Sequence, residues 1–262
     1  MTDPLHRNAL FDLTGRTALI TGASAGIGAR FAKLLAMNGA NVVLAARRED
    51  KLAEQLAAIK EFGGRAITVA MDVSDEQSTR EAFDKAEGTF GTVDTIIANA
   101  GIAHDGAAID LSADELENVL SVNVKGSFLT AREGMLRMRE TDIAKRGDGR
   151  IIFTSSITAK AIVPGVMAYG ASKAALTHMG RSLAREWARH GVNVNVLAPG
   201  YILTEINAYL WDQENGKRMM SRWPRRRVMD IDALDGAMLF LASSASRYLT
   251  GTVLDVDDGQ ML

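Results

Sequence analysis

The chain has 262 residues, of which 47% are hydrophobic and 24% are charged, and its formal net charge is −2. This composition is that of an ordinary globular protein with enough apolar side chains for a buried core, which argues against a disordered chain. The near-neutral charge gives no electrostatic attraction to nucleic acid or to an anionic membrane, so we expect a small molecule as partner. At about 150 residues per domain the length permits one or two domains, and we favour a single domain spanning 1–262.

Cysteine is absent, which excludes disulfides, thiolate catalysis and cysteine-ligated metal. The histidines, His6, His104, His178 and His190, are scattered without ligand spacing, and we predict no metal site. The amino-terminal stretch 1–16 contains acidic residues and lacks a long apolar run, so it predicts neither a secretory signal nor a spanning helix. We therefore expect a cytoplasmic protein.

Short β-branched runs alternate along the chain with longer stretches of helical periodicity. The alternation predicts an α/β fold with a doubly wound, parallel, seven-stranded sheet and helices on both faces. Nearly continuous apolar strands are expected where helices cover both faces. The predicted strands are 17–21, 41–46, 66–71, 94–98, 150–155, 192–198 and 252–256. The predicted helices lie near 26–39, 50–62, 75–89, 112–139, 168–190, 204–221 and 231–243.

A glycine-rich turn, TGASAGIG at 21–28, joins the first predicted strand to the first predicted helix. Gly22, Gly26 and Gly28 let backbone N–H groups approach an anion, and the helix amino terminus adds partial positive charge. A glycine pattern alone is weak evidence. Here it follows a strand and opens a helix in the first βα unit of an alternating chain, which predicts a dinucleotide site with the pyrophosphate at this turn.

The end of the second predicted strand indicates which dinucleotide binds. The neutral Ala46 is followed directly by Arg47 and Arg48. An NAD site needs an acidic residue here for the ribose hydroxyls, whereas the 2′-phosphate of NADP needs a guanidinium. We therefore favour NADP(H). The alternative, NAD(H), requires that both arginines are solvated and that Glu49 or Asp50 holds the ribose, although acids at this place are also expected to begin the next helix.

The segment YGASK places Tyr169 and Lys173 four positions apart among small residues, which brings both side chains to nearly the same face of a helix. The simpler interpretation is a lysine that snorkels over a half-buried tyrosine. The functional interpretation is an acid–base pair. An ammonium about 4 Å from the phenol contributes up to roughly 4 kcal/mol at an effective dielectric of about 20, and this is expected to lower the pKa of Tyr169 from about 10. That shift would favour proton transfer near neutral pH.

Taken together, the glycine turn, the strand pattern and YGASK make the sequence resemble the short-chain dehydrogenase/reductase family over nearly its whole length. The resemblance implies a Rossmann-type fold and a catalytic tetrad of Asn123 in SVNVKG, Ser156 in TSS, Tyr169 and Lys173. It implies that Ser156 holds the substrate oxygen, that Lys173 also binds the nicotinamide ribose, and that Asn123 holds a water on the proton path.

The cofactor-binding residues predicted from the residues and the resemblance are Gly22, Ser24, Gly26, Ile27, Gly28, Arg47, Arg48, Asp72, Val73, Asn99, Ala100, Gly101, Tyr169, Lys173, Pro199, Gly200, Ile202 and Thr204. Two positions depart from the family pattern. Ala98 replaces the first asparagine of its Asn-Asn-Ala-Gly motif, and Asp258 replaces a glycine in its closing Val-Asp-Gly-Gly motif. We expect the second change to alter a loop near a subunit contact without touching the chemistry. Enoyl reductases of the same superfamily separate the tyrosine and lysine by six residues, so the spacing here favours carbonyl chemistry.

The irregular stretch 204–227 is predicted to be a substrate flap. Its apolar side chains would form a pocket for a bulky ketone or secondary alcohol; alternatively, they belong to an amphipathic helix packed on the domain. These side chains are Ile206, Tyr209, Leu210, Trp211, Met219, Met220 and Trp223.

Two other functions are compatible with the sequence. One is reduction of a 3-oxoacyl thioester on an acidic carrier protein, docked on Arg222, Arg225, Arg226 and Arg227. The other is a non-catalytic dinucleotide-binding sensor or scaffold, which the presence of both Tyr169 and Lys173 disfavours. The predicted helices 112–139 and 168–190 resemble those that pack between subunits in the family, so we expect a homodimer or homotetramer.

Overall fold

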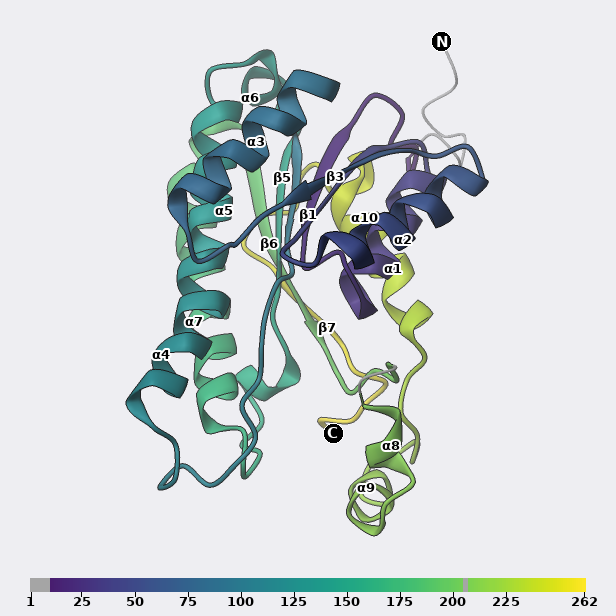
Figure 1. The fold of residues 1–262 in the computed structure, drawn as a ribbon, viewed down its shortest axis with the longest axis vertical. Helices are drawn as coiled ribbons and strands as arrows, with labels where there is room; N and C mark the ends of the chain where they lie inside the picture. Colours follow the sequence, from purple (N-terminus) through teal and green to yellow (C-terminus); the bar gives the residue numbers. More distant parts are fainter. Residues whose placement is uncertain (1–9, 205–206) are drawn as a thin grey trace.

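One parallel sheet of seven strands forms the centre of the computed structural model, which describes residues 10–204 and 207–262. The strand order is β3-β2-β1-β4-β5-β6-β7, with helices on both faces (Figure 1). This confirms the predicted α/β, doubly wound architecture. The strands are β1 Thr17–Thr21, β2 Asn41–Ala46, β3 Arg65–Ala70, β4 Thr95–Ala98, β5 Gly149–Thr154, β6 Val192–Pro199 and β7 Val253–Val256. The amino-terminal segment with His6, and Ile206 of the predicted flap, lie outside the described residues.

Helices connect successive strands across the sheet. The α-helices are α1 Gly26–Met37, α2 Glu49–Glu61, α3 Glu76–Phe90, α4 Ala113–Leu120, α5 Ser127–Met138, α6 Asp142–Arg146, α7 Met167–Trp187, α8 Ala208–Trp211, α9 Glu214–Met220 and α10 Asp235–Ala242. A π-helical turn, η1, spans Ser121–Gly126. Short 3₁₀ turns are η2 Ile157–Ala159, η3 Ala188–His190, η4 Ile231–Leu234 and η5 Ser244–Ser246.

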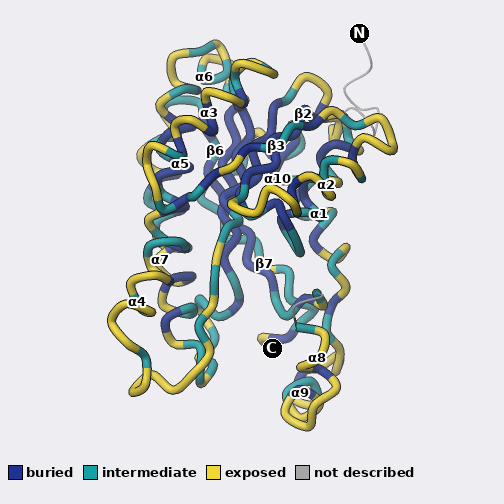
Figure 2. The backbone as a smooth tube through the Cα atoms, in the orientation of Figure 1, coloured by how far each residue is buried: buried dark blue, intermediate teal, exposed yellow. Residues whose placement is uncertain are grey.

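Two apolar layers, one on each face of the sheet, make up the core. Phe31 of α1 and Leu52 of α2 pack on one face together with α10, and Phe83 of α3 packs on the other together with α5 and α7. Figure 2 shows the central strands buried along their length. Since each fully buried large apolar side chain contributes about 1.5–3 kcal/mol, these layers fix the sheet as a rigid support for the loops at its edge.

The predicted helix 112–139 is interrupted in the structure. It consists of α4, the π-helical turn η1 and α5. Asn123 lies in that turn, fully buried, and its side-chain amide donates to the carbonyl of Ile102 and to the hydroxyl of Ser172, each at 2.9 Å. A π turn widens the helix locally, and such turns are frequent at functional sites. The hydrogen bonds of Asn123 to Ile102 and Ser172, which are distant from it in the sequence, therefore accompany the break between α4 and α5.

Three other segments differ from the predicted elements. The helix predicted at 204–221 is two short helices, α8 and α9, separated by a break at 212–213. The helix predicted at 231–243 begins as the 3₁₀ turn η4. The short helix α6 was not predicted; the hydroxyl of Thr141 accepts a hydrogen bond from the backbone of Ile143 at its start.

The order in which successive strands are added to the sheet reverses between β1 and β4, and this point determines where a ligand site can form. β1 pairs with β2 on one side and with β4 on the other, so the connections leaving the carboxyl ends of β1 and β4 diverge. In open α/β sheets the crevice at this point is where ligands bind. No helix in the part of the chain that the structure describes is long and apolar enough to cross a membrane.

Candidate active site

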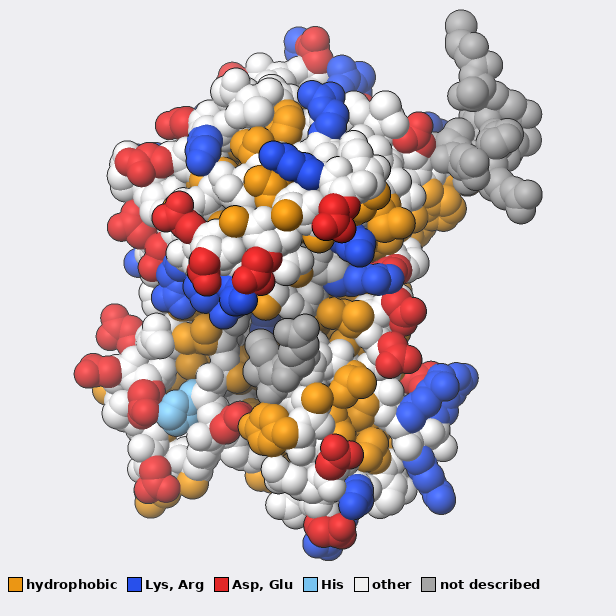
Figure 3. Space-filling model, turned by 45° about the vertical axis from the view of Figure 1, so that its right-hand side comes forward, with side chains coloured by type: hydrophobic (Ala, Val, Ile, Leu, Met, Phe, Trp, Pro, Cys, Tyr) orange, Lys and Arg blue, Asp and Glu red, His pale blue; other side chains and the backbone are white. Residues whose placement is uncertain are grey.

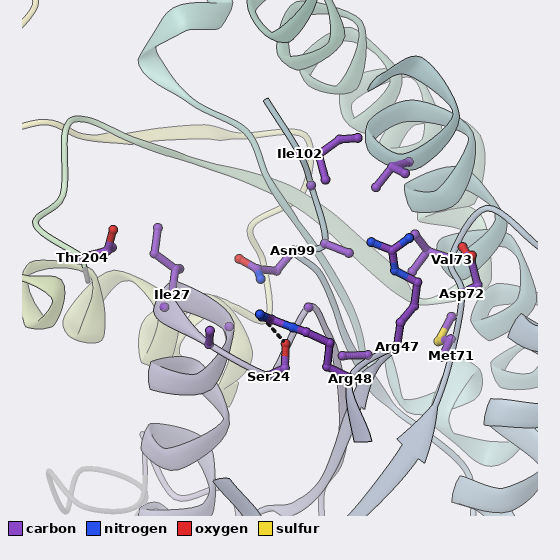
Figure 4. A pocket seen from close by; sticks show the side chains of 18 residues that line it. Ser24, Ile27, Arg47, Arg48, Met71, Asp72, Val73, Asn99, Ile102 and Thr204 are labelled. Carbon is purple, nitrogen blue, oxygen red and sulfur yellow. Dashed lines mark hydrogen bonds between the residues drawn. The ribbon is translucent and has the colours of Figure 1, made fainter. Parts of the chain in front are cut away.

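A cavity of about 510 Å³ lies over the carboxyl ends of β1, β2, β3 and β4. Figure 4 shows it extending from Thr204 and Ile27 at one end to Arg47 and Asp72 at the other. The predicted cofactor residues that line it are Gly22, Ser24, Gly26, Ile27, Gly28, Arg47, Arg48, Asp72, Val73, Asn99, Ala100, Gly101 and Thr204. The structure therefore gathers most of the predicted set from five separate segments into one elongated cleft, here called the dinucleotide cleft.

The glycine turn forms the floor of the dinucleotide cleft. Gly22 has a φ of 69°, a left-handed conformation that a side chain would strain. A Cβ at Gly28 would collide with the carbonyl of Gly22 and the side chain of Asn99. Ala25, which precedes α1, offers no side chain to cap the helix, so the first backbone N–H groups of α1 remain for an anion in the cleft. This floor fits a pyrophosphate.

Asn99 and Ala100 are tied to the end of β1 by Thr21. Its hydroxyl accepts from the backbone N–H groups of Asn99 and Ala100, each at 3.0 Å, and its carbonyl accepts from the Asn99 amide at 3.1 Å. Ala98, the departure from the family motif, is buried at the end of β4. Thr21 therefore holds Asn99 and Ala100 in the wall of the cleft, although position 98 carries an alanine in place of the asparagine of the family motif.

Two guanidinium groups define the other end of the cleft. Arg48 turns toward the glycine turn and donates to the Ser24 hydroxyl at 3.0 Å, whereas Arg47 extends beside Val73 and Asp72 (Figure 4). Glu49 and Asp50 begin α2 and are exposed, as expected for acids in a first helical turn. The charges at this end therefore fit a ribose phosphate.

Asp72 remains ionised at neutral pH. Its carboxylate accepts from the hydroxyl of Ser74 at 2.7 Å and from the Ser74 backbone at 2.9 Å. The Ser74 hydroxyl is the main cause that lowers the pKa of Asp72, and the charges of Arg47 and Lys125 lower it further. The Asp72 carboxylate beside Arg47 is thus a fixed hydrogen-bond acceptor, which fits the contact with the adenine that the resemblance implies for this residue.

A second cavity, of about 280 Å³, adjoins the dinucleotide cleft and is called here the catalytic cavity. It lies over the ends of β4, β5 and β6, and the predicted residues that line it are Ile27, Asn99, Gly101, Ser156, Tyr169, Lys173, Pro199 and Gly200. Ile27, Asn99 and Gly101 line both spaces. A ligand in the cleft therefore extends directly to the three polar side chains Ser156, Tyr169 and Lys173. Within the described residues, no three His, Asp or Glu side chains gather as a metal site would require.

Lys173 lies against the ring of Tyr169 on the first turns of α7. Its ammonium is 5.5 Å from the ring centroid and donates to the carbonyl of Thr154 at 2.8 Å. The neighbouring Ser155 ties β5 to α7 because its hydroxyl donates to the Lys173 carbonyl at 3.0 Å. The end of β5 and the start of α7 therefore hold the lysine and tyrosine on one face, as their spacing predicted.

The electrostatics differ from the expectation based on that spacing. Burial raises the pKa of Tyr169, a hydrogen bond with Ser156 lowers it, and the neighbouring phenol of Tyr201 raises it further. Burial also lowers the pKa of Lys173 to about 8. The expectation that the Lys173 ammonium lowers the pKa of Tyr169 is wrong for this structure. Desolvation is the largest cause of the Tyr169 shift, and the hydrogen bond with Ser156 is the effect that opposes it.

Asn123 contacts the loop after β4 and helix α7 and does so through its side-chain amide. Its carbonyl oxygen Oδ1 accepts from the backbone of Ile102 at 2.8 Å, and its two amide protons go to Ile102 and Ser172. The whole side chain is thus engaged in holding the loop after β4 against α7. A Cβ at Gly101 would lie 3.3 Å from both Asn123 and Lys173, so this loop passes close to the lysine. The water-binding role implied by the resemblance stays a prediction.

The flap packs differently from the predicted apolar pocket. Trp211 and Trp223 are each 8% exposed and surround Tyr201, whose ring stacks on Trp223 at 5.2 Å and meets Trp211 edge-on at 5.4 Å. No described flap residue beyond Thr204 lines either cavity. Ile202, predicted to contact the cofactor, is buried outside both linings, and its carbonyl accepts from Asn207 at 2.8 Å.

Two residues near the site were not singled out from the sequence. Tyr201 follows Pro199 and Gly200, and its backbone N–H donates at 2.7 Å to the side chain of Gln260. Gln260 lies near the carboxyl terminus and is only 8% exposed. A glutamine near a chain end has no sequence signal that predicts such a contact. Tyr201 could have been found as the aromatic residue after the Pro-Gly pair at the end of β6.

A dinucleotide-shaped cleft that ends at a serine, a buried lysine and a tyrosine defines a nucleotide-dependent oxidoreductase of the α/β class. Comparison with known proteins narrows this class. Residues 22–261 match the family described as enoyl-(acyl carrier protein) reductase. The sequence is 35% identical over 251 residues to gluconate 5-dehydrogenase of Gluconobacter oxydans (strain 621H), covering 95% of this chain and 96% of the relative. The chain belongs to the short-chain dehydrogenase/reductase family.

Solved structures agree in fold. A gluconate 5-dehydrogenase from Burkholderia cenocepacia J2315, in complex with NADP and tartrate, superposes with a TM-score of 0.90 at 34% identity, covering 98% of this chain and 99% of that one. A 3-oxoacyl (acyl-carrier-protein) reductase from Agrobacterium tumefaciens C58 with NADP bound gives a TM-score of 0.90 at 31% identity, with the same coverage of both chains. The protein is thus an oxidoreductase of this family.

Proposed function

We propose that the protein is an NADP(H)-dependent oxidoreductase that interconverts a secondary alcohol and a ketone. The observation that carries the proposal is the convergence of Ser156, Tyr169 and Lys173 in one cavity that shares its wall with the dinucleotide cleft. When bound, the nicotinamide supplies or accepts the hydride, and the protein supplies the proton and the orientation.

In this proposal Ser156 and Tyr169 hold the reacting oxygen of the substrate. Tyr169 donates a proton to that oxygen during ketone reduction and accepts it during alcohol oxidation, while Ser156 stabilises the charge that develops there. Lys173 holds its ammonium beneath the tyrosine ring and binds the ribose hydroxyls of the cofactor. Asn123 fixes the loop at Gly101–Ile102 that separates the cleft from α7.

The relatives and the size of the catalytic cavity favour a small, polar substrate. Two of the compared proteins are named gluconate 5-dehydrogenases. A cavity of about 280 Å³, with the hydroxyls of Ser156 and Tyr169 in its wall, suits a short polyhydroxylated molecule better than a bulky apolar one. The predicted bulky ketone is less well supported because the flap tryptophans pack on Tyr201 and line neither cavity.

The 3-oxoacyl thioester alternative is favoured by the match to the carrier-protein reductase, but its docking surface is weakened. Arg225 and Arg227 each form an ion pair with Asp258, at 2.9 and 2.7 Å, so one carboxylate offsets part of the charge of the arginine run. Figure 3 shows acidic and basic side chains interspersed over one face of the molecule, without a broad basic patch. The homodimer or homotetramer and the cytoplasmic location expected from the sequence stay proposals.

A substrate panel tests this function. We expect NADPH consumption with ketones of sugar acids and ketoses, slower consumption with aryl or steroidal ketones, and little with 3-oxoacyl thioesters. Absorbance of NADPH and NADH followed in parallel measures all of them. Higher kcat/KM on the thioesters would favour the carrier-protein reductase, and binding of NADPH without turnover on any carbonyl would favour the sensor or scaffold.

The arginine pair provides a separate test of cofactor choice. Replacing Arg47 and Arg48 together by alanine is expected to raise KM for NADPH about 10²- to 10⁴-fold, because each charge-assisted hydrogen bond to a phosphate contributes roughly 1.5–3 kcal/mol and two are removed. KM for NADH should stay within about threefold, since NADH lacks the 2′-phosphate to which these guanidinium groups are assigned. Steady-state kinetics with both cofactors on one substrate measure the ratio. Equal losses with NADPH and NADH would contradict the assignment.

A further inference from the structure

The arginine run at the end of the flap meets the turn near the carboxyl terminus. The flap is the stretch 204–227, of which 207–227 and Thr204 are described, and the C-terminal turn is 257–260. Asp258 forms an ion pair with Arg225 at 2.9 Å through one carboxylate oxygen, and its other oxygen pairs with Arg227 and accepts a hydrogen bond from it at 2.7 Å. The Asp258 side chain is only 12% exposed, whereas those of Arg225 and Arg227 are 65% and 62% exposed. The two arginines thus cover a single carboxylate.

Backbone strain marks both sides of this contact. In the described chain, the non-glycine residues with positive φ are Arg226, at 50°, and Asp258, at 52°. Side chains disfavour this left-handed conformation, and it persists where surrounding contacts fix it. The left-handed residue between Arg225 and Arg227 lets both side chains reach the same carboxylate. The strained residue of the C-terminal turn carries that carboxylate.

The same turn also holds Tyr201. The Gln260 side chain accepts from the Tyr201 N–H at 2.7 Å, and its amide lies 3.4 Å from the Tyr201 and Arg227 carbonyls, to which it donates. Tyr201 in turn stacks on Trp223, two residues before Arg225 in the flap. A Cβ at Gly200 would collide with Gln260 and Asp257, so the end of β6 is packed closely on this turn.

Tyr201 links this assembly to the catalytic cavity. It follows Pro199 and Gly200, which line that cavity with Tyr169. Its phenol also lies near enough to Tyr169 to influence the ionisation of that residue. A shift of the flap end would therefore move the wall that a substrate meets beside Tyr169.

We propose that Asp258 is a positioning residue whose ion pairs with Arg225 and Arg227 latch the flap to the C-terminal turn and thereby fix Tyr201 beside the catalytic cavity. Asp258 lines neither the dinucleotide cleft nor the catalytic cavity, so its role is to position Tyr201 and not to take part in proton or hydride transfer. The kinetic consequence rests on the proposed function, whereas the latch is a property of the folded chain.

Asp258→Asn tests the latch through kinetics. Asparagine tolerates a positive φ and keeps the size of the side chain, so the variant removes the charge and leaves the backbone. We expect KM for the carbonyl substrate to rise about five- to tenfold, because two partly exposed ion pairs are lost. We expect kcat within about threefold of wild type, because the reacting groups are intact. Affinity for NADPH should change little, since the glycine turn and the Arg47–Arg48 pair, to which the phosphates are assigned, belong neither to the flap nor to the C-terminal turn.

Salt and a matched control separate a latch from general destabilisation. Because both arginines are exposed, added NaCl should raise KM of the wild type toward that of Asp258→Asn and leave the variant nearly unaffected. Glu214→Gln breaks an ion pair of 3.4 Å to Lys217 inside α9, within the flap but away from the C-terminal turn, and should leave KM unchanged. A rise of KM in Glu214→Gln equal to that in Asp258→Asn would overturn the proposal.

Limited trypsin digestion tests the latch without activity. Lys217, Arg218 and Arg222 provide cleavage sites in the flap. We expect cleavage there to be about three- to tenfold faster in Asp258→Asn than in wild type or Glu214→Gln, because local opening precedes cleavage. Thermal midpoints within about 2 °C would show that the fold is intact. Unchanged cleavage rejects the latch, whereas a wild type without carbonyl turnover rejects the proposed function and leaves the digestion result decisive for the latch.

Discussion

Tyr169→Phe should lower kcat for ketone reduction by about 10²- to 10⁴-fold, the range that general acid catalysis contributes. The substitution keeps the ring, whose centroid is 5.5 Å from the Lys173 ammonium, and removes only the hydroxyl that pairs with Ser156. The affinity for NADPH should therefore stay nearly unchanged. Steady-state kinetics and fluorescence titration of NADPH measure the two quantities on the same preparation.

The pH dependence of the wild type should follow from the same residue. Burial raises the pKa of Tyr169 above its ordinary value of 10.0, so the phenol keeps its proton throughout the neutral range. Reduction needs the protonated phenol and should not be lost through Tyr169 ionisation at neutral pH, whereas oxidation needs the ionised phenol and should increase as pH rises. Tyr209→Phe, at an exposed flap position, is the control and should match wild type. Full activity in Tyr169→Phe would refute the assignment.

The parts of the site that the sequence predicted are those fixed by local geometry. A glycine turn between a strand and a helix places Gly22 and Gly28 at the floor of a cleft wherever the first βα unit folds. The four-residue spacing of Tyr169 and Lys173 sets them on one helical face through the geometry of α7 alone. The strand pattern predicted the sheet for the same reason, since burial on both faces leaves a continuous apolar run that the sequence shows directly.

The parts that the sequence could not predict depend on contacts between distant segments. Asn123 interrupts a helix through bonds to Ile102 and Ser172, which only the folded chain brings together. The direction of the Tyr169 pKa shift depends on how completely the site is desolvated, and spacing carries no information on burial. The role of Asp258 likewise depends on where the flap ends in space, although its departure from the family motif marked the position.

Lys173→Met should combine a loss of activity of at least about 10²-fold with a change in how stability depends on pH. The Lys173 ammonium is buried and donates to the Thr154 carbonyl, and burial lowers its pKa from 10.5 to about 8. The unfolded chain binds this proton up to about pH 10.5, whereas the folded chain releases it near pH 8, so the unfolded state holds more protons between these values.

The stability of the wild type should therefore rise as pH increases from about 8 to 10.5, and the destabilisation present below pH 8 corresponds to about 3 kcal/mol. Lys173→Met has no such proton, so its free energy of unfolding should lack this rise, and the difference between the two proteins should shrink or reverse across that window. Denaturant unfolding at several pH values measures the difference, and Lys33→Met, at an exposed lysine of α1, should follow the wild type. Parallel curves for wild type and Lys173→Met would contradict a buried, ionisable lysine at the catalytic cavity. Such curves would mean that solvent reaches Lys173 freely, because desolvation is the cause that lowers its pKa in the folded chain.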